Sequence, residues 1–109
     1  MRIALVQINP TVGDIAGNVQ RVRDGIRRAR EAGARLAVFP ELALLGYPPR
    51  DLLLKSGLVE ANLDALASLA AETWGIAALV GYVDRNPAPV GRPLTNAVAL
   101  LDGGGGGAR

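Results

Sequence analysis

The sequence predicts an α/β fold that begins with a strand–helix–strand unit. Three observations predict it: four short apolar runs have the length of buried strands, two longer segments carry apolar residues at helical spacing, and strand and helix patterns alternate over the first 40 residues. A crossover of this length makes the two strands that it joins parallel. At 109 residues, half of them hydrophobic and only 4% aromatic, the chain is at most one domain with an aliphatic core.

The first unit has clear boundaries. Residues 2–8 form an apolar run typical of a strand, and Asp14 is a candidate N-cap for the helix that follows. The helix is expected over residues 18–32, and Gly33 stands where a helix C-terminal glycine is common. Residues 34–39 then form a second strand. The apolar stripe of the helix comprises Val19, Val22, Ile26 and Ala29.

The second half repeats the pattern less regularly. Ser56 is a candidate cap for a helix that runs to about Thr73. Two further apolar strands are expected at residues 76–83 and 95–101, joined by a proline-containing turn over residues 84–93. The stripe of this second helix comprises Val59, Leu63, Leu66 and Ala70.

Composition excludes several classes of function. The net charge is +2 with both signs interspersed, which does not indicate a nucleic-acid partner. The chain has no cysteine and no histidine, so it offers no disulfide, no thiol nucleophile and no imidazole base. No apolar run reaches the ~18 residues of a membrane span, and the first residues do not read as a signal peptide. We therefore expect a cytoplasmic protein without a membrane partner.

One carboxylate stands at a position where α/β proteins place their sites. The apolar strand ends at Pro40, which cannot donate to a sheet ladder, and Glu41 follows directly. Sites in open α/β sheets gather outside the carboxyl ends of the strands. A rigid Gly-Tyr-Pro-Pro loop at residues 46–49 comes next. From spacing alone, an ordinary solvated loop carboxylate is the more common interpretation of Glu41.

The same region carries a family resemblance. The tetrapeptide FPEL at residues 39–42 resembles the catalytic glutamate motif of the nitrilase, or carbon–nitrogen hydrolase, superfamily. The segments GYPPRDLL at residues 46–53, QINPTVGD at residues 7–14 and GN at residues 17–18 are similar to the glutaminase domains of glutamine-dependent NAD synthetases. The three motifs in this order are far more specific than FPEL alone. The resemblance covers Met1 to about Leu101.

The resemblance implies an architecture. Domains of this superfamily are four-layer α-β-β-α sandwiches much longer than 109 residues, so the βαβ unit, second helix and two further strands are expected to be the first part of such a sandwich, incomplete as a layer. Residues 1–102 are then the N-terminal portion of the domain, and residues 103–109 a glycine-rich turn or tail.

The resemblance also implies chemistry. Glu41 is then the general base that activates a cysteine thiol for amide hydrolysis. Tyr47 is a candidate for lining the glutamine pocket, although packing of its ring on the neighbouring prolines is an equally good interpretation. The family's cysteine and lysine have no match here, because the chain lacks cysteine and Lys55 lies outside the motif. The chain alone is therefore expected to be inactive.

Partners follow from the same resemblance. No cofactor or metal is expected in this segment. In the complete family members, a C-terminal synthetase domain uses ATP and Mg²⁺ to convert deamido-NAD to NAD with ammonia released from glutamine, and we expect a homo-oligomer. Two alternatives stay open: a fragment of another carbon–nitrogen hydrolase, such as an amidase or carbamoylase, and a non-enzymatic α/β module.

Overall fold

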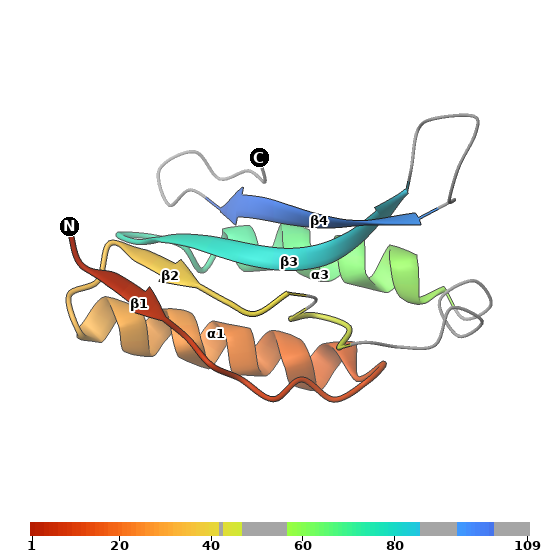
Figure 1. The fold of residues 1–109 in the computed structure, drawn as a ribbon, viewed down its shortest axis with the longest axis horizontal. Helices are drawn as coiled ribbons and strands as arrows, with labels where there is room; N and C mark the ends of the chain where they lie inside the picture. Colours follow the sequence, from red (N-terminus) through yellow and green to blue (C-terminus); the bar gives the residue numbers. More distant parts are fainter. Residues whose placement is uncertain (42, 47–56, 86–93, 102–109) are drawn as a thin grey trace.

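The computed structural model describes residues 1–41, 43–46, 57–85 and 94–101, the first three residues of the last range by their backbone only. Its elements follow the expected order of strands and helices (Figure 1). They are β1 (Ile3–Leu5), α1 (Ile15–Glu31), β2 (Leu36–Val38), α3 (Leu58–Ala70), β3 (Ala77–Arg85) and β4 (Leu94–Leu101). The predicted α/β class is confirmed.

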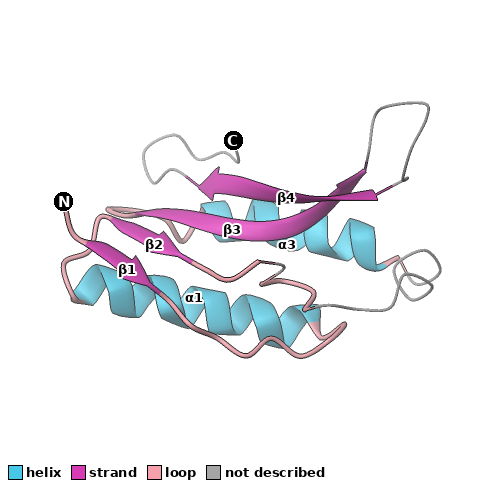
Figure 2. Ribbon diagram, viewed as in Figure 1, coloured by secondary structure: helices cyan, strands magenta, loops and turns pink. Residues whose placement is uncertain are grey.

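The four strands form one sheet in the order β1-β2-β3-β4. The first three strands are parallel to one another, as predicted for β1 and β2, and β4 is antiparallel to β3. Both helices pack on the same face of this sheet (Figure 2). Because β1, β2 and β3 run in the same direction, their carboxyl ends meet at one edge of the sheet, where Glu41 follows β2.

The core lies between the helices and the covered face of the sheet. The predicted stripe of α1 is buried there, with Ile26 completely inaccessible to solvent. Burying such a side chain stabilises a fold by about 1.5–3 kcal/mol. Gly25 lets α1 approach the sheet closely, because a Cβ at this position would lie 2.8 Å from both the Phe39 ring and the Val6 side chain.

The helix ends differ in part from the predictions. α1 begins three residues earlier than expected, and the predicted cap is confirmed because the Asp14 carboxylate accepts a hydrogen bond from the Gly17 N–H. At α3 the predicted cap was wrong: Ser56 lies outside the described residues, and the N-cap position belongs to Gly57, which has a φ of 69° and provides no side-chain bond. α3 also ends at Ala70 rather than Thr73, because the buried Thr73 hydroxyl donates to the Ala70 carbonyl and closes the helix in a turn.

The opposite face of the sheet has no cover among the described residues. Ile3 and Leu5 of β1 are 52% and 78% exposed, and Val98 of β4 is 62% exposed. These side chains alternate with the buried ones, as they must in a pleated sheet. A sheet that is apolar on both faces belongs to a larger layered structure, which agrees with the incomplete layer predicted above. The predicted boundary between the domain and the glycine-rich segment at 103–109 lies outside the described residues.

Candidate active site

The site is built around the end of β2. The Phe39 N–H donates to the Leu79 carbonyl at 3.1 Å, which extends the pairing with β3 one residue beyond the strand. Pro40 has no N–H to continue it. Glu41 therefore leaves the sheet at the edge where the parallel strands end, and its side chain is exposed to solvent. This is the position that the sequence predicted for the carboxylate.

Glu41 stands beside a hollow of about 450 Å³. The lining comes from three neighbouring strands and the residues directly after β2: Val38, Phe39, Pro40, Glu41, Leu79, Gly81, Ala97 and Val98. Among the described residues of this lining, Glu41 is the charged one and the others are apolar. A concave apolar surface with one carboxylate provides a place where a proton acceptor can face a small organic substrate.

The loop behind Glu41 is firmly packed. Ala43, Leu44 and Leu45 are all completely buried. Gly46 has a φ of 71°, which favours glycine, and a Cβ there would lie 3.3 Å from the Val12 backbone. The Gly13 N–H donates to the Leu45 carbonyl at 3.0 Å. This loop is thus held against the β1–α1 connection.

A buried asparagine completes this contact between the two loops. The Asn18 amide nitrogen donates to the Leu44 and Thr11 carbonyls, each at 2.8 Å, and its oxygen accepts from the Thr11 N–H and from Arg21. In the sequence, Asn18 stands out only as part of the GN motif at residues 17–18, and no place in the site was predicted for it. A signal was available: Asn18 lies one turn before Val22 on the apolar stripe, and buried polar groups are nearly always hydrogen-bonded.

Two other residues considered from the sequence, Tyr47 and Lys55, lie outside the described residues. No group of three or more histidine, cysteine, aspartate or glutamate residues lies together as metal ligands within the described ranges. Nor does any helix in that part of the chain have the length and apolar character needed to cross a membrane.

One tyrosine has a perturbed acidity but lies away from the hollow. Burial raises the pKa of the Tyr82 phenol above its usual value of 10, and the Asp84 carboxylate beside it raises that pKa further. Tyr82 alternates with Gly81 along β3, and it packs against the helix-covered core rather than the open face. These contacts give Tyr82 a structural role.

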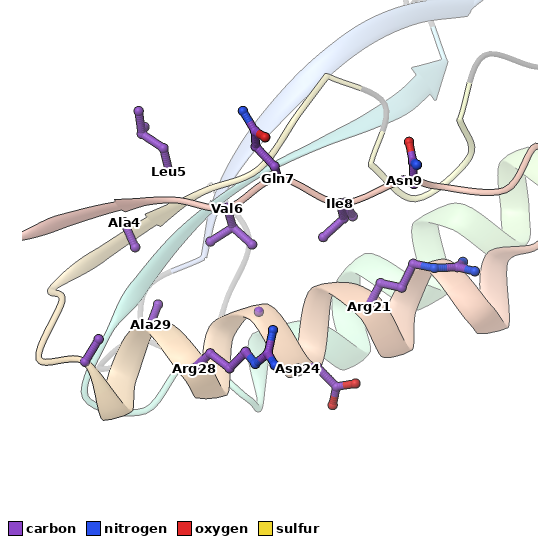
Figure 3. Close-up of a pocket in the computed structure, with 12 residues that line it drawn as sticks. Ala4, Leu5, Val6, Gln7, Ile8, Asn9, Arg21, Asp24, Arg28 and Ala29 are labelled. Atoms are coloured by element: carbon purple, nitrogen blue, oxygen red, sulfur yellow. The ribbon is translucent and has the colours of Figure 1, made fainter.

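A second hollow, of about 590 Å³, lies between the end of β1 and α1 (Figure 3). Figure 3 shows Ala4 and Val6 directed toward α1, while Leu5 and Gln7 point away from it. Charged residues of α1 line its rim, but Asp24 already accepts from Gln20 and pairs with Arg27. Glu41 is not part of this lining, so the two hollows are separate features.

Comparison with known protein families shows to which family this chain belongs. The profile of the carbon–nitrogen hydrolase family matches residues 2–107. The chain belongs to the carbon–nitrogen hydrolase family. The match includes the FPEL segment and the strand that precedes it, so the resemblance inferred from these motifs is confirmed.

Individual relatives agree with this membership. A glutamine-dependent NAD(+) synthetase of Xylella fastidiosa is 42% identical over 102 residues, which cover 93% of this chain and 18% of that protein. The solved glutamine-dependent NAD(+) synthetase of Cytophaga hutchinsonii superposes with a TM-score of 0.84 at 28% identity, covering 95% of this chain and 17% of that one. An amidase from Nesterenkonia sp. superposes with a TM-score of 0.77 at 28% identity, covering 100% of this chain and 40% of the amidase.

The chain therefore spans less than a fifth of the length of the NAD synthetases that it matches. One solved form of the Nesterenkonia amidase carries acrylamide added at its active-site cysteine. The present chain contains no cysteine. What this carbon–nitrogen hydrolase segment shares with its solved relatives is thus the arrangement of its sheet and of α1 and α3.

Proposed function

We propose that this chain is the N-terminal segment of the glutamine amidohydrolase domain of a glutamine-dependent NAD synthetase. The observation that carries the proposal is the position of Glu41, at the open edge of the parallel strands and beside an apolar hollow, in a chain 42% identical to such an enzyme. In this proposal Glu41 accepts a proton from a thiol supplied by a later part of the protein.

The chemistry assigned to Glu41 is general base catalysis. A carboxylate that removes the thiol proton produces the thiolate, which attacks the side-chain amide carbon of glutamine. The same carboxyl group can then return the proton to the departing nitrogen, so that ammonia leaves as a neutral molecule. The exposed side chain of Glu41 suits both steps, because the carboxylate must reach groups that the described residues do not provide.

Further properties belong to the same proposal. The released ammonia would serve a C-terminal synthetase part that uses ATP and Mg²⁺, and the residues holding that nucleotide and metal would come from that part. The whole protein would be a cytoplasmic homo-oligomer. The names of the relatives and the fraction of their length that this chain represents support the synthetase part of this proposal.

A second candidate function has its own observation. The Nesterenkonia amidase superposes over the whole of this chain, and the segment represents 40% of that shorter enzyme. A simple amidase segment would use Glu41 in the same way but would need no synthetase part. The 42% identity to the Xylella fastidiosa synthetase and the higher TM-score of the Cytophaga hutchinsonii synthetase, 0.84 against 0.77 for the amidase, favour the first proposal.

A chimera tests both proposals. This chain replaces the matching N-terminal segment of the Xylella fastidiosa enzyme, and NAD formation is measured with glutamine and, separately, with free ammonia as the nitrogen source. We expect the chimera to use both. Glu41→Gln, which keeps the shape but cannot accept a proton, should lower the glutamine-supported rate by about 10²- to 10⁴-fold and leave the ammonia-supported rate unchanged.

The matched control is Glu31→Gln, which alters another exposed glutamate at the end of α1. It should change neither rate. If Glu41→Gln retains glutamine-dependent activity near that of the chimera, Glu41 is an ordinary loop carboxylate. If the chimera hydrolyses simple aliphatic amides but not glutamine, the amidase proposal takes its place.

A further inference from the structure

We propose that Asn18 is a positioning residue that fixes the Glu41 loop against the β1–α1 connection. The inference rests on the proposed function of Glu41, and it adds a residue on a different element, 23 positions away along the chain. Asn18 is completely buried in the first turns of α1. Its amide joins the two loops that face each other at the carboxyl edge of the sheet.

The hydrogen bonds of Asn18 use the full capacity of its side chain. Both amide hydrogens are donated, to the Leu44 and Thr11 carbonyls, and both lone pairs of the oxygen are used, by the Thr11 N–H and Arg21. Aspartate could not donate to Leu44, and an apolar residue could neither donate nor accept. These four hydrogen bonds therefore require asparagine at position 18, and another residue of similar size could not form all of them.

The bond to Leu44 acts close to the proposed base. Leu44 is three residues after Glu41, so the two Cα atoms can be at most about 11 Å apart along the chain. Among the described residues, the Gly13–Leu45 backbone bond and the close approach of Gly46 to Val12 hold the same segments together. The contact made by Asn18 uses a polar side chain, whereas the other two involve the backbone. A substitution at Asn18 can therefore remove this contact without altering the backbone of either segment.

A second buried asparagine provides a matched control. Asn62 in α3 is also completely buried, donates to the Val59 and Val83 carbonyls and accepts from the Val83 N–H. It joins α3 to β3, and among the described residues it forms no hydrogen bond with the loop after Glu41. Removing either asparagine leaves buried backbone groups without partners. Asn18 is hydrogen-bonded to the loop after Glu41, whereas the Asn62 partners Val59 and Val83 reach that loop only by apolar packing on Leu45.

The first experiment uses the chimera with the Xylella fastidiosa enzyme. We expect Asn18→Ala to lower the kcat for glutamine-supported NAD formation by about 10- to 100-fold, because small displacements of a catalytic group reduce rates by that order. The KM for glutamine and the ammonia-supported rate should each change by less than about threefold, because neither depends on the position of Glu41. Asn62→Ala should leave the ratio of the two rates unchanged, even where both variants lower the Tm.

The second experiment uses the 109-residue chain. Amide hydrogen exchange at Gly13, whose N–H donates to the Leu45 carbonyl, should accelerate in Asn18→Ala and not in Asn62→Ala. Should Asn18→Ala fail to fold, Asn18→Asp keeps both acceptor bonds and removes the donations to the Leu44 and Thr11 carbonyls, so it tests the same contact.

The outcomes separate the two proposals. If Glu41→Gln abolishes glutamine use while Asn18→Ala keeps the rate ratio, the positioning role is wrong and the proposed function stands. If Glu41→Gln leaves glutamine use intact, the proposed function is wrong, and the catalytic importance of Asn18 falls with it. Unchanged exchange at Gly13 in both Asn18 variants would also overturn the positioning role.

Discussion

The two faces of the sheet differ in what covers them, although both are apolar. On one face α1 and α3 bury an aliphatic core in which Ile26 and Val80 are inaccessible to solvent. On the other face Leu5 and Val98 are largely exposed, and the hollow beside Glu41 opens there. The residues are of the same chemical type on both faces, so only the presence or absence of a packing layer distinguishes them.

This difference separates stability from function in the molecule. Among the described residues, α1 and α3 cover one face, and the apolar burial there provides most of the folding free energy of this part of the chain. The open face carries the proposed base and a hollow but no nucleophilic thiol. Each of the following predictions concerns a substitution on one face, or the addition of the domain part that the open face lacks. The result is compared with the corresponding result for the other face.

The largest expected difference is in catalysis. We predict that the 109-residue chain releases no ammonia from glutamine above a protein-free control, because it lacks cysteine and has no histidine to activate a hydroxyl. The chimera described above, which supplies the rest of the domain, should release it. A coupled ammonia assay on purified chain measures this. Sustained release that disappears in Glu41→Gln would contradict the prediction, because the open face would then be competent alone.

The next difference is in stability. Ile26→Ala on the covered face should lower the free energy of unfolding by about 2–5 kcal/mol, because it removes buried apolar surface and leaves a cavity. Leu5→Ala on the open face should change it by no more than about 0.5 kcal/mol. Urea unfolding followed by circular dichroism compares the two variants with the unsubstituted chain. Equal losses would mean that the open face is buried in solution.

The smallest expected effect concerns association. The exposed apolar side chains of the open face and the unpaired edge strands should make the isolated chain associate with itself. Replacing both Leu5 and Val98 with lysine should reduce the apparent mass in light scattering and leave the helical circular dichroism signal unchanged. Arg27→Lys with Arg28→Lys, at exposed positions of α1, is the matched control. A monodisperse monomer without any substitution would show that the open face does not promote association.

The position of Glu41 could be predicted from the sequence because it depends on residues that are adjacent in the chain. Pro40 ends β2 for lack of an N–H, so the position of Glu41 at the strand exit follows from two adjacent residues. Asn18 was not recognised, because its partners Thr11 and Leu44 lie 7 and 26 residues away, and no local rule connects them. The cap of α3 was misassigned for a different reason: Gly57 takes the N-cap position through its backbone conformation, with a φ of 69°, and not through a capping side chain.

The sequence by itself determined the order and type of the elements, the stripe of α1 and the carboxylate after β2, because these arise from periodicity and from the chemistry of single residues such as proline. The tertiary structure alone decided which face of each strand is covered, that β4 runs antiparallel beside β3, and that two distant loops meet at Asn18. Those features depend on contacts between residues far apart in the chain, and such contacts form only when the sheet and helices pack together.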